Sequence, residues 1–300
     1  MSTVKSYLSL IKFSHTIFAM PFAVIGFCLG ITTWSFSVVP GWHIIIYPWR
    51  EIIGLFILVI LCMILARSAA MAFNRYLDRN FDAKNPRTAI REIPSGIISA
   101  NSALVLTVTS SFFFIITCYF INRVCFFLSP VALLVVLGYS YTKRFTPLCH
   151  LILGLGLSLA PIGAYLAVTG HFSFLPILFS LTVIFWVSGF DIIYALQDEE
   201  FDKSQKLYSM PAWLGRSKAL RVSELLHVLS VVCIVAAGIG GSFGWLYWMG
   251  VIIFSGMLIY QHSIVKPNDL KKVNLAFMTA NGMASVIFAC FVIADLFFHY

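Results

Sequence analysis

Long apolar runs alternate with short polar segments along the whole chain, and this pattern predicts its secondary structure. A helix that crosses the hydrocarbon core of a bilayer needs about 20 apolar residues. Nine runs reach or approach this length, at about 14–32, 52–73, 103–120, 124–139, 151–168, 174–189, 222–240, 244–260 and 275–298. They are too continuous for the alternating pattern of barrel strands. We therefore expect an all-α, polytopic membrane bundle of nine transmembrane helices.

The composition extends this expectation to the whole chain. Of its 300 residues, 60% are hydrophobic and only 11% are charged. Helices are favoured because every backbone polar group must find a partner within the segment when lipid surrounds it. Since the apolar runs are spread over the full length, residues 1–300 are expected to form a single membrane-embedded domain.

The distribution of basic residues predicts the orientation of the bundle. The chain has 20 Lys and Arg against 12 Asp and Glu, a formal net charge of +8. With a cytoplasmic N-terminus and nine spans, Arg50 and Arg123 are the basic residues on the outer side, and the other 18 lie at or near the inner face. Cytoplasmic loops of membrane proteins carry this excess. The lipid bilayer thus explains the charge, and no nucleic-acid partner is expected.

The second apolar run ends in a stripe formed by Asn74, Asp78 and Asp82. Residues four apart lie one above the other on a helix, and Arg67 lies two turns deeper on the same side. Two carboxylates on one face repel each other, so a cation is expected beside them. Oxygen ligands without Cys or His suit Mg²⁺. Basic alternatives are Arg75, Arg79, Lys84 and Arg87, and a solvated helix end is the plainer interpretation.

A second acidic stripe follows the sixth apolar run and favours a functional interpretation of both. Asp191, Tyr194, Asp198 and Asp202 are expected on one helical face. The last two carboxylates follow the pair of the first stripe by the same interval of 120 residues (198 − 78 and 202 − 82). Both runs end on the inner side, so the motifs at 74–82 and 191–202 are predicted to share one mouth of the bundle.

Four carboxylates, an Asn and basic residues at one membrane mouth fit a diphosphate bound with Mg²⁺. The chain also contains 28 Phe and 12 Tyr, so an apolar, aromatic interior behind the mouth would accept a hydrocarbon tail. Ionising an allylic diphosphate requires stabilisation of the leaving charge and exclusion of water. Aromatic faces stabilise a nearby cation. The residues thus favour chemistry on a lipid-linked diphosphate.

The motifs N-R-x-x-D-x-x-x-D, from Asn74, and D-x-x-Y-x-x-x-D-x-x-x-D, from Asp191, resemble those of the UbiA superfamily of membrane aromatic prenyltransferases. The likeness extends over about residues 5–215 and includes Arg67-Ser-Ala-Ala, Arg87-Thr, Pro94-Ser-Gly and Ser209. It implies transfer of a polyprenyl group from polyprenyl diphosphate to a small aromatic acid, 4-hydroxybenzoate being the expected acceptor, in respiratory quinone (ubiquinone) biosynthesis. It also implies a central cavity open to the cytoplasmic face of a bacterial cytoplasmic membrane.

The resemblance further implies a role for each residue of the motifs. Mg²⁺ would be held by Asp78, Asp82, Asp198 and Asp202. The diphosphate would be bound by Asn74, Arg75, Arg87, Lys143 and Lys203. The expected catalytic residues, deeper and nearer the acceptor ring, are Arg67, Asp191 and Tyr194. In one departure from the family pattern, the segment after Asp198 reads Glu-Glu-Phe-Asp where a more basic start is expected.

Some alternatives remain open at the level of sequence. The acceptor could instead be a dihydroxynaphthoate of menaquinone biosynthesis. A membrane transporter would also carry carboxylates within a bundle, although usually near the midplane and at broken helices. A buried Arg67 needs an anionic partner, and either the acceptor carboxylate or Asp191 would serve.

Overall fold

The computed structural model describes residues 3–11, 18–34 and 49–298, and regular structure in these ranges is helical. Within them, the isolated bridge between Lys266 and Asp269 is the sole β-type pairing. The all-α prediction is therefore confirmed. Positions 14–17 of the first expected span lie outside the described residues.

The helical elements follow one another along the chain. In order they are α1 (Thr3–Leu10), α2 (Met20–Trp34), α3 (Trp49–Asp82), α4 (Ala100–Ile121), α5 (Arg123–Thr142), α6 (Cys149–Thr169), α7 (Phe174–Ala195), the 3₁₀ turn η2 (Leu196–Asp198), α8 (Glu199–Ser204), α9 (Met210–Leu214), α10 (Arg216–Gly240), α11 (Trp245–Ile264), the π-helical turn η3 (Leu275–Ala280) and α12 (Asn281–Phe298).

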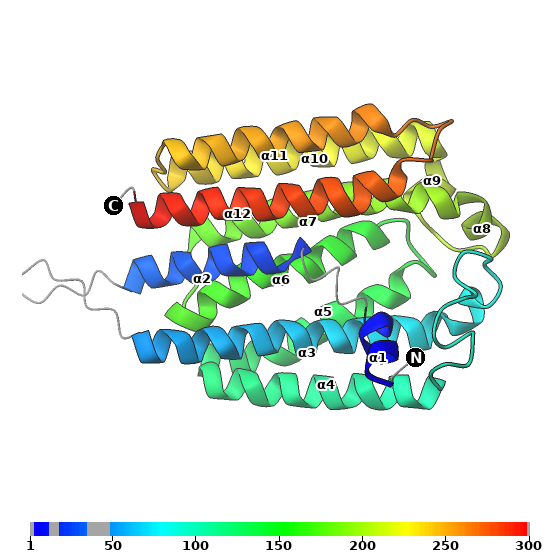
Figure 1. The fold of residues 1–300 in the computed structure, drawn as a ribbon, viewed down its shortest axis with the longest axis horizontal. Coiled ribbons are helices and arrows are strands. Elements are labelled where there is room, and N and C mark those ends of the chain that lie inside the picture. The colour runs from blue at the N-terminus through cyan, green and yellow to red at the C-terminus, as the bar shows by residue number, and fades with distance from the viewer. Residues whose placement is uncertain (1–2, 12–17, 35–48, 299–300) are drawn as a thin grey trace, which may run out of the picture.

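The long helices lie side by side as one bundle, with α1 across them (Figure 1). Helix α3 packs on α4, α2 on α6, α6 on α7, α7 on α10, and α11 on α12. Helices α2, α6, α7 and α12 therefore occupy the middle, between the α3–α4–α5 group and the α10–α11 pair. The sites of interest lie between the α3–α4–α5 group and this middle layer.

Seven helices in the described part of the chain are long and apolar enough to cross a membrane. The chain is thus an integral membrane protein. The remaining two predicted spans fall on α2, which is shorter, and on α11, which is not among the seven. The count of nine spans stays a prediction.

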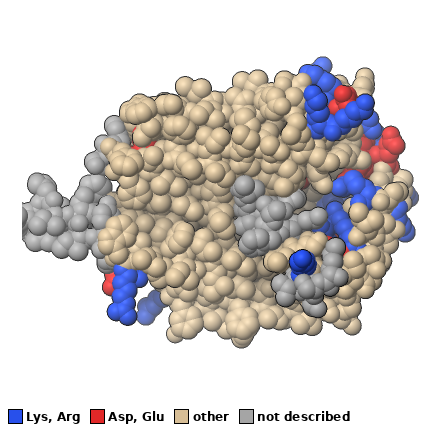
Figure 2. Space-filling model, in the orientation of Figure 1, with Lys and Arg blue, Asp and Glu red and all other residues tan. Residues whose placement is uncertain are grey.

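On the face shown in Figure 2, most of the charged side chains gather at the two ends of the bundle, and the surface between them is largely free of charge. The larger group lies at the end that carries α8 and α9, where α3 and α7 also end. Arg50 and Arg123 stand at the start of α3 and of α5, which is the opposite end. This distribution has the asymmetry that the positive-inside rule requires.

Two glycines let the middle helices approach closely. A Cβ at Gly26 of α2 would lie 2.0 Å from the carbonyl oxygen of Pro161 in α6. A Cβ at Gly154 of α6 would lie 2.4 Å from the carbonyl oxygen of Ile184 in α7. Small residues at helix contacts allow this backbone approach in membrane bundles. Helix α6 is thereby held between its neighbours, and it forms one wall of the cavity described below.

Asp295, near the end of α12 away from the acidic motifs, has a structural role that the sequence did not indicate. It is buried, and its carboxylate accepts hydrogen bonds from the backbone N–H groups of Gly244 (2.7 Å) and Tyr247 (3.2 Å). These are donors at the start of α11, which have no partner within that helix. Asp295 therefore caps α11 from a neighbouring helix.

Candidate active site

The first acidic motif forms the stripe that its spacing predicts. Helix α3 continues without interruption to Asp82, so Asn74, Asp78 and Asp82 follow one another at intervals of four residues. The Asn74 side-chain nitrogen donates to Asp78 Oδ2 at 3.2 Å and also reaches Ser140 Oγ at 3.4 Å. Asp78 is 2% exposed and Asp82 is 5% exposed. Buried carboxylates of this kind need cationic or hydrogen-bonding partners.

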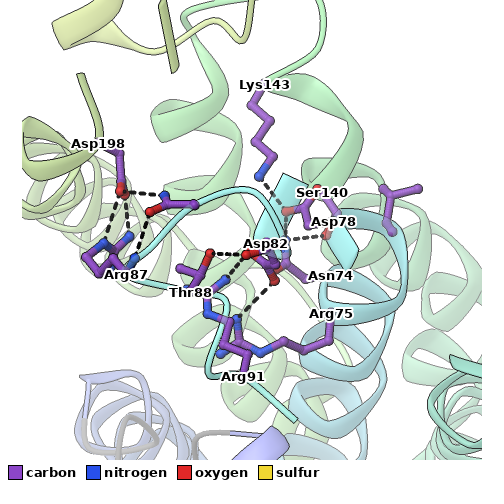
Figure 3. A network of polar contacts seen from close by, with 12 residues as sticks. Asn74, Arg75, Asp78, Asp82, Arg87, Thr88, Arg91, Ser140, Lys143 and Asp198 are labelled. Carbon is purple, nitrogen blue, oxygen red and sulfur yellow. Dashed lines mark hydrogen bonds and ion pairs between the residues drawn. The ribbon is translucent and has the colours of Figure 1, made fainter. Parts of the chain in front are cut away.

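Basic side chains from the segments after α3 and α5, and from α3 itself, supply these partners (Figure 3). Asp78 pairs with Lys143 and with Arg144, whose Nη2 lies 3.0 Å from Oδ1. Asp82 accepts from Arg91 Nη1 at 2.7 Å, and the buried Arg75 lies 4.0 Å from its other oxygen. Lys143 and Arg75 thus lie beside the carboxylates of the first motif.

The prediction that the second motif lies on one continuous helical face is wrong. Helix α7 ends at Ala195, the 3₁₀ turn η2 carries Asp198, and α8 begins at Glu199. A 3₁₀ turn has fewer residues per turn than an α-helix, so it changes the register between Asp191 and Asp202. Asp202 instead accepts a hydrogen bond at 2.8 Å from Ser209 Oγ, at the N-cap of α9.

The loop after α3 joins the two motifs. Asn85 donates to Asp198 Oδ1 at 3.2 Å, and Arg87 pairs with the same carboxylate through Nε (3.0 Å) and Nη2. Arg87 Nη1 also donates to Tyr194 Oη at 2.8 Å. Thr88 anchors the loop by donating to the backbone oxygen of Asp82 at 3.1 Å. The two motifs therefore meet at one end of the bundle, as predicted from the two apolar runs that end on the same side.

The contact with Asp198 keeps the guanidinium of Arg87 positively charged. Burial lowers the pKa of its guanidinium, but the hydrogen bonds and charge of Asp198 more than offset burial, so the net pKa is raised. A guanidinium that stays charged can exchange its carboxylate for a phosphate, which has the same bidentate geometry.

Lys203 lies in α8, where Glu199 holds it. Its Nζ is 2.6 Å from Glu199 Oε1, and the second oxygen of that carboxylate is 2.7 Å from Arg216 Nε. The Lys203 side chain is 51% exposed. The acidic Glu-Glu-Phe-Asp segment thus has a local role, because Glu199 ties α8 to the start of α10.

A cavity of about 480 Å³ lies between α3, α4, α5, α6 and α7. Its lining includes Arg67 and Asp191, the residues that the sequence analysis placed near the aromatic acceptor. Apolar side chains form most of its lining. Arg67, Tyr139 and Asp191 also line it, together with the rings of Phe190 and Phe277. The cavity therefore combines a long apolar wall with a few polar groups, which is typical of a ligand site.

Asp191 has a partner that the sequence analysis missed. Its Oδ2 lies 2.7 Å from Nδ1 of His150, the second residue of α6. His150 Nε2 is 3.2 Å from the backbone nitrogen of Met210, which can only donate. Nε2 must therefore be the acceptor, and Nδ1 carries the proton that it donates to Asp191. The imidazole fixes the direction of the carboxylate.

Other residues of the network were also missed as site residues. They are Asn85, Arg91, Ser140 and Arg144. Arg144 carried a signal, because it directly follows Lys143, which the sequence analysis did name as a site residue. His150 and Asp191 are 41 positions apart in the chain, so their pairing could not be predicted from the spacing of residues within one helix.

Comparison with known proteins identifies the family of the chain. Residues 23–284 match the UbiA prenyltransferase family. A 4-hydroxybenzoate octaprenyltransferase of Aliivibrio salmonicida is 30% identical over 257 residues, which cover 83% of this chain and 84% of that protein. The structure of a UbiA homolog from Aeropyrum pernix K1 superposes with a TM-score of 0.76 at 28% identity, covering 94% of this chain and 96% of the other.

A more distant structural neighbour was determined with ligands. It is a UbiA homolog from Archaeoglobus fulgidus bound to DMAPP and Mg²⁺, with a TM-score of 0.67, 21% identity and coverage of 97% and 99% of the two chains. At that identity the likeness is one of fold. The family match extends over most of the chain and includes both acidic motifs. The chain belongs to the UbiA prenyltransferase family and is a membrane-embedded prenyltransferase.

Proposed function

We propose that this enzyme transfers a polyprenyl group from polyprenyl diphosphate to the ring of 4-hydroxybenzoate. One observation carries the proposal: a polar mouth built from two carboxylate motifs and basic side chains opens beside an apolar cavity that Arg67 and Asp191 line. This arrangement suits a ligand with an anionic head and a long hydrocarbon tail. The relatives named as 4-hydroxybenzoate octaprenyltransferases support the choice of acceptor.

The diphosphate would bind among the basic groups of the mouth. Lys143 and Arg87 now contact Asp78 and Asp198, and phosphate oxygens would compete for the same N–H donors. Asn74 and Arg75 flank these groups on α3. Lys203 would contribute at the periphery, since its side chain is half exposed and already paired with Glu199.

The donor set of the mouth fits Mg²⁺. Asp78, Asp82, Asp198 and Asp202 offer oxygen alone, and the buried Oδ2 of Asp82 has no hydrogen-bond partner among the described residues. Nowhere in the described ranges do three or more His, Cys, Asp or Glu side chains gather as a ready metal site. Each motif would therefore supply part of a coordination shell that phosphate oxygens and water complete. Bound there, Mg²⁺ would neutralise the charge that develops on the leaving diphosphate.

Arg67 and Asp191 would handle the acceptor. Arg67 lines the cavity and would bind the ring carboxylate, for which a guanidinium offers two parallel donors. Asp191, held by His150, would accept a hydrogen bond from the phenol hydroxyl. Electron density then rises at the ring carbon ortho to that hydroxyl, which makes this carbon the nucleophile.

The transfer itself balances without any further reactant. The allylic C–O bond of the donor breaks, and its electron pair leaves with the diphosphate. The ortho carbon of the ring forms the new C–C bond to the allylic carbon. The ring then loses the proton from that carbon to the released diphosphate, which restores its aromaticity. Phe190 and Phe277 line the cavity near Asp191 and would shield the allylic cation from water.

A dihydroxynaphthoate is the second acceptor that fits the same site, because it also carries a carboxylate and a phenol hydroxyl on an aromatic ring system. A transporter is less favoured, since the Asp pairs lie at helix ends on one side of the bundle. We also infer, from the asymmetry of basic residues, that the active site faces the cytoplasm from a bacterial inner membrane.

The test uses membranes that contain the full chain, supplied with Mg²⁺, a polyprenyl diphosphate and either acceptor. Mass spectrometry of the lipid extract should reveal prenylated 4-hydroxybenzoate, and it should be absent when Asp78→Ala replaces the parent chain. A product from the naphthoate alone would assign the second acceptor. No prenylated product from either acceptor would overturn the proposal.

A further inference from the structure

The last membrane-spanning segment, Leu275–Phe298, does not begin as an α-helix. The six residues of η3, Leu275–Ala280, form a π-helical turn that leads directly into α12 at Asn281. Backbone hydrogen bonds in such a turn join residues i and i+5. This conformation is rare in proteins and occurs mostly as single turns within α-helices. Turns of this kind are frequent at functional sites.

The Asn281 side chain forms hydrogen bonds that stabilise this turn. Its side-chain nitrogen donates to the backbone oxygens of Ala276 (3.0 Å) and Phe277 (3.1 Å), within the π-helical turn. Its side-chain oxygen accepts from Trp186 Nε1 (2.9 Å) on α7 and from Gln261 Nε2 (2.8 Å) on α11. All the hydrogen-bonding positions of this fully buried amide are used. Asn281 therefore joins the turn to two neighbouring helices in one fixed orientation.

The turn presents Phe277 to the reactive end of the cavity. The Phe277 ring lies 4.3 Å from the ring of Tyr194, at an interplanar angle of 32°, and 5.3 Å and 5.4 Å from Phe18 and Phe190. Phe277 lines the cavity that Asp191 also lines. A single ring thus contacts the second acidic motif, through Tyr194, and the space where the donor tail would lie.

Tyr194 links Phe277 to Arg87, one of the basic residues proposed to bind the diphosphate. Its hydroxyl accepts from Arg87 Nη1 at 2.8 Å, and the Arg87 guanidinium also lies 5.2 Å from the centre of its ring. Arg87 in turn holds Asp198. The orientation of Phe277 is therefore coupled, through two contacts, to a basic side chain of the mouth.

We propose that Asn281 is a positioning residue that acts through the π-helical turn to hold Phe277 against Tyr194 beside the reacting atoms. This inference rests on the proposed prenyl transfer and adds a residue remote from both acidic motifs. Without the amide, the turn would relax to an α-helix, which removes one residue from its register. Phe277 would then rotate by about 100° about the helix axis and leave Tyr194.

Kinetics of three variants test the proposal in the full chain. Asn281→Leu and Phe277→Leu should each lower kcat by roughly 10²-fold, the effect expected from a misplaced reacting group, with a much smaller change in KM for the donor. The double variant should lose no more than either single one, because both remove the same contact. The matched control is Ser230→Ala, which also removes a buried hydrogen bond to α7, that of Ser230 Oγ with the Thr182 oxygen (3.0 Å), away from the site.

Some outcomes would overturn the proposal. They are a kcat for Asn281→Leu equal to that of Ser230→Ala, losses that add in the double variant, or an effect confined to KM. Should Asn281→Leu fail to fold, as judged by its thermal unfolding, Phe277→Leu alone decides, and unchanged kcat in that variant refutes the role of the ring.

A second measurement separates this proposal from the proposed function. Tyr194→Cys and Phe277→Cys are introduced together into a chain whose seven native cysteines are replaced by alanine, and a short thiol cross-linker is added. The cross-link should form when Asn281 is present and be lost with Asn281→Leu, whether or not the chain prenylates any acceptor. Equal cross-linking with and without Asn281 would overturn the positioning role.

Discussion

The imidazole of His150, at the start of α6, donates from Nδ1 across 2.7 Å to the carboxylate of Asp191 on α7. His150 is buried and is itself held by the backbone N–H of Met210 at 3.2 Å, whereas Asp191 lines the cavity. One group is thus fixed by the fold, and the other is available to a ligand. This pairing gives Asp191 a defined direction before any acceptor arrives.

We predict that Asp191→Asn lowers chiefly kcat, because an amide cannot take a proton from the phenol. His150→Phe should lower kcat by about 10- to 100-fold, the equivalent of one hydrogen bond to a charged group. Neither change should greatly alter KM for the donor. Steady-state kinetics with saturating donor checks both. Full kcat in His150→Phe would show that Asp191 needs no orientation.

Arg67→Gln should act on the acceptor in a different way. If the guanidinium binds the ring carboxylate, its loss removes binding that substrate and transition state share, so KM for the acceptor rises while kcat changes little. The measurement is acceptor KM with donor saturating. A phenol without a carboxylate distinguishes the roles further, since it should lose nothing with Arg67→Gln. Equal losses for both acceptors would contradict the assignment.

Lys143 and Lys203 should differ in their effect on the donor. Lys143 contacts a buried carboxylate of the first motif, and Lys143→Ala is expected to raise KM for the donor diphosphate by tenfold or more, the equivalent of about 1.5 kcal/mol. Lys203 is half exposed and forms a local ion pair of a kind that contributes about 1 kcal/mol or less, so Lys203→Ala should have a small effect. Titration of the donor against both variants checks the order, and the reverse order would refute it.

Removal of divalent metal should abolish turnover. We expect chelated membranes to be inactive and to recover with Mg²⁺, and Asp78→Ala or Asp198→Ala to lose roughly 10²-fold or more in kcat. Asp269→Asn is the matched control, because this carboxylate accepts from the backbone N–H of Lys271 at 3.1 Å and belongs to the loop between α11 and η3, outside both motifs. Turnover at the full rate in chelated membranes would rule the metal out.

The sequence predicted the first acidic stripe well because an α-helix continues through it. From Arg67 to Asp82 the chain has no Pro or Gly, so the spacing of Asn74, Asp78 and Asp82 translates directly into one face. The same reasoning failed at Leu196–Asp198, where a 3₁₀ turn interrupts the second stripe without any Pro or Gly to announce it. The spacing of acidic residues therefore identified both motifs, but it predicted the helical geometry of the first motif alone.

Residues whose role depends on contacts between distant helices could not be predicted. His150 meets Asp191, and Asn281 meets Trp186 95 positions earlier in the chain. Asp295, which carried no functional signal, caps a helix that begins 50 positions before it (295 − 245). Each is a buried polar group that must find a partner, and the sequence does not say where that partner lies.

The most direct test of the whole account follows the ring proton of the acceptor. Membranes that contain the chain are given Mg²⁺, a polyprenyl diphosphate and 4-hydroxybenzoate deuterated at all ring positions, and the product is analysed by mass spectrometry. The account predicts a product that has lost one deuterium, from the carbon ortho to the hydroxyl, and predicts its disappearance with Asp78→Ala. A product that retains every ring deuterium, and is therefore joined through oxygen, would contradict it, as would the absence of any prenylated product.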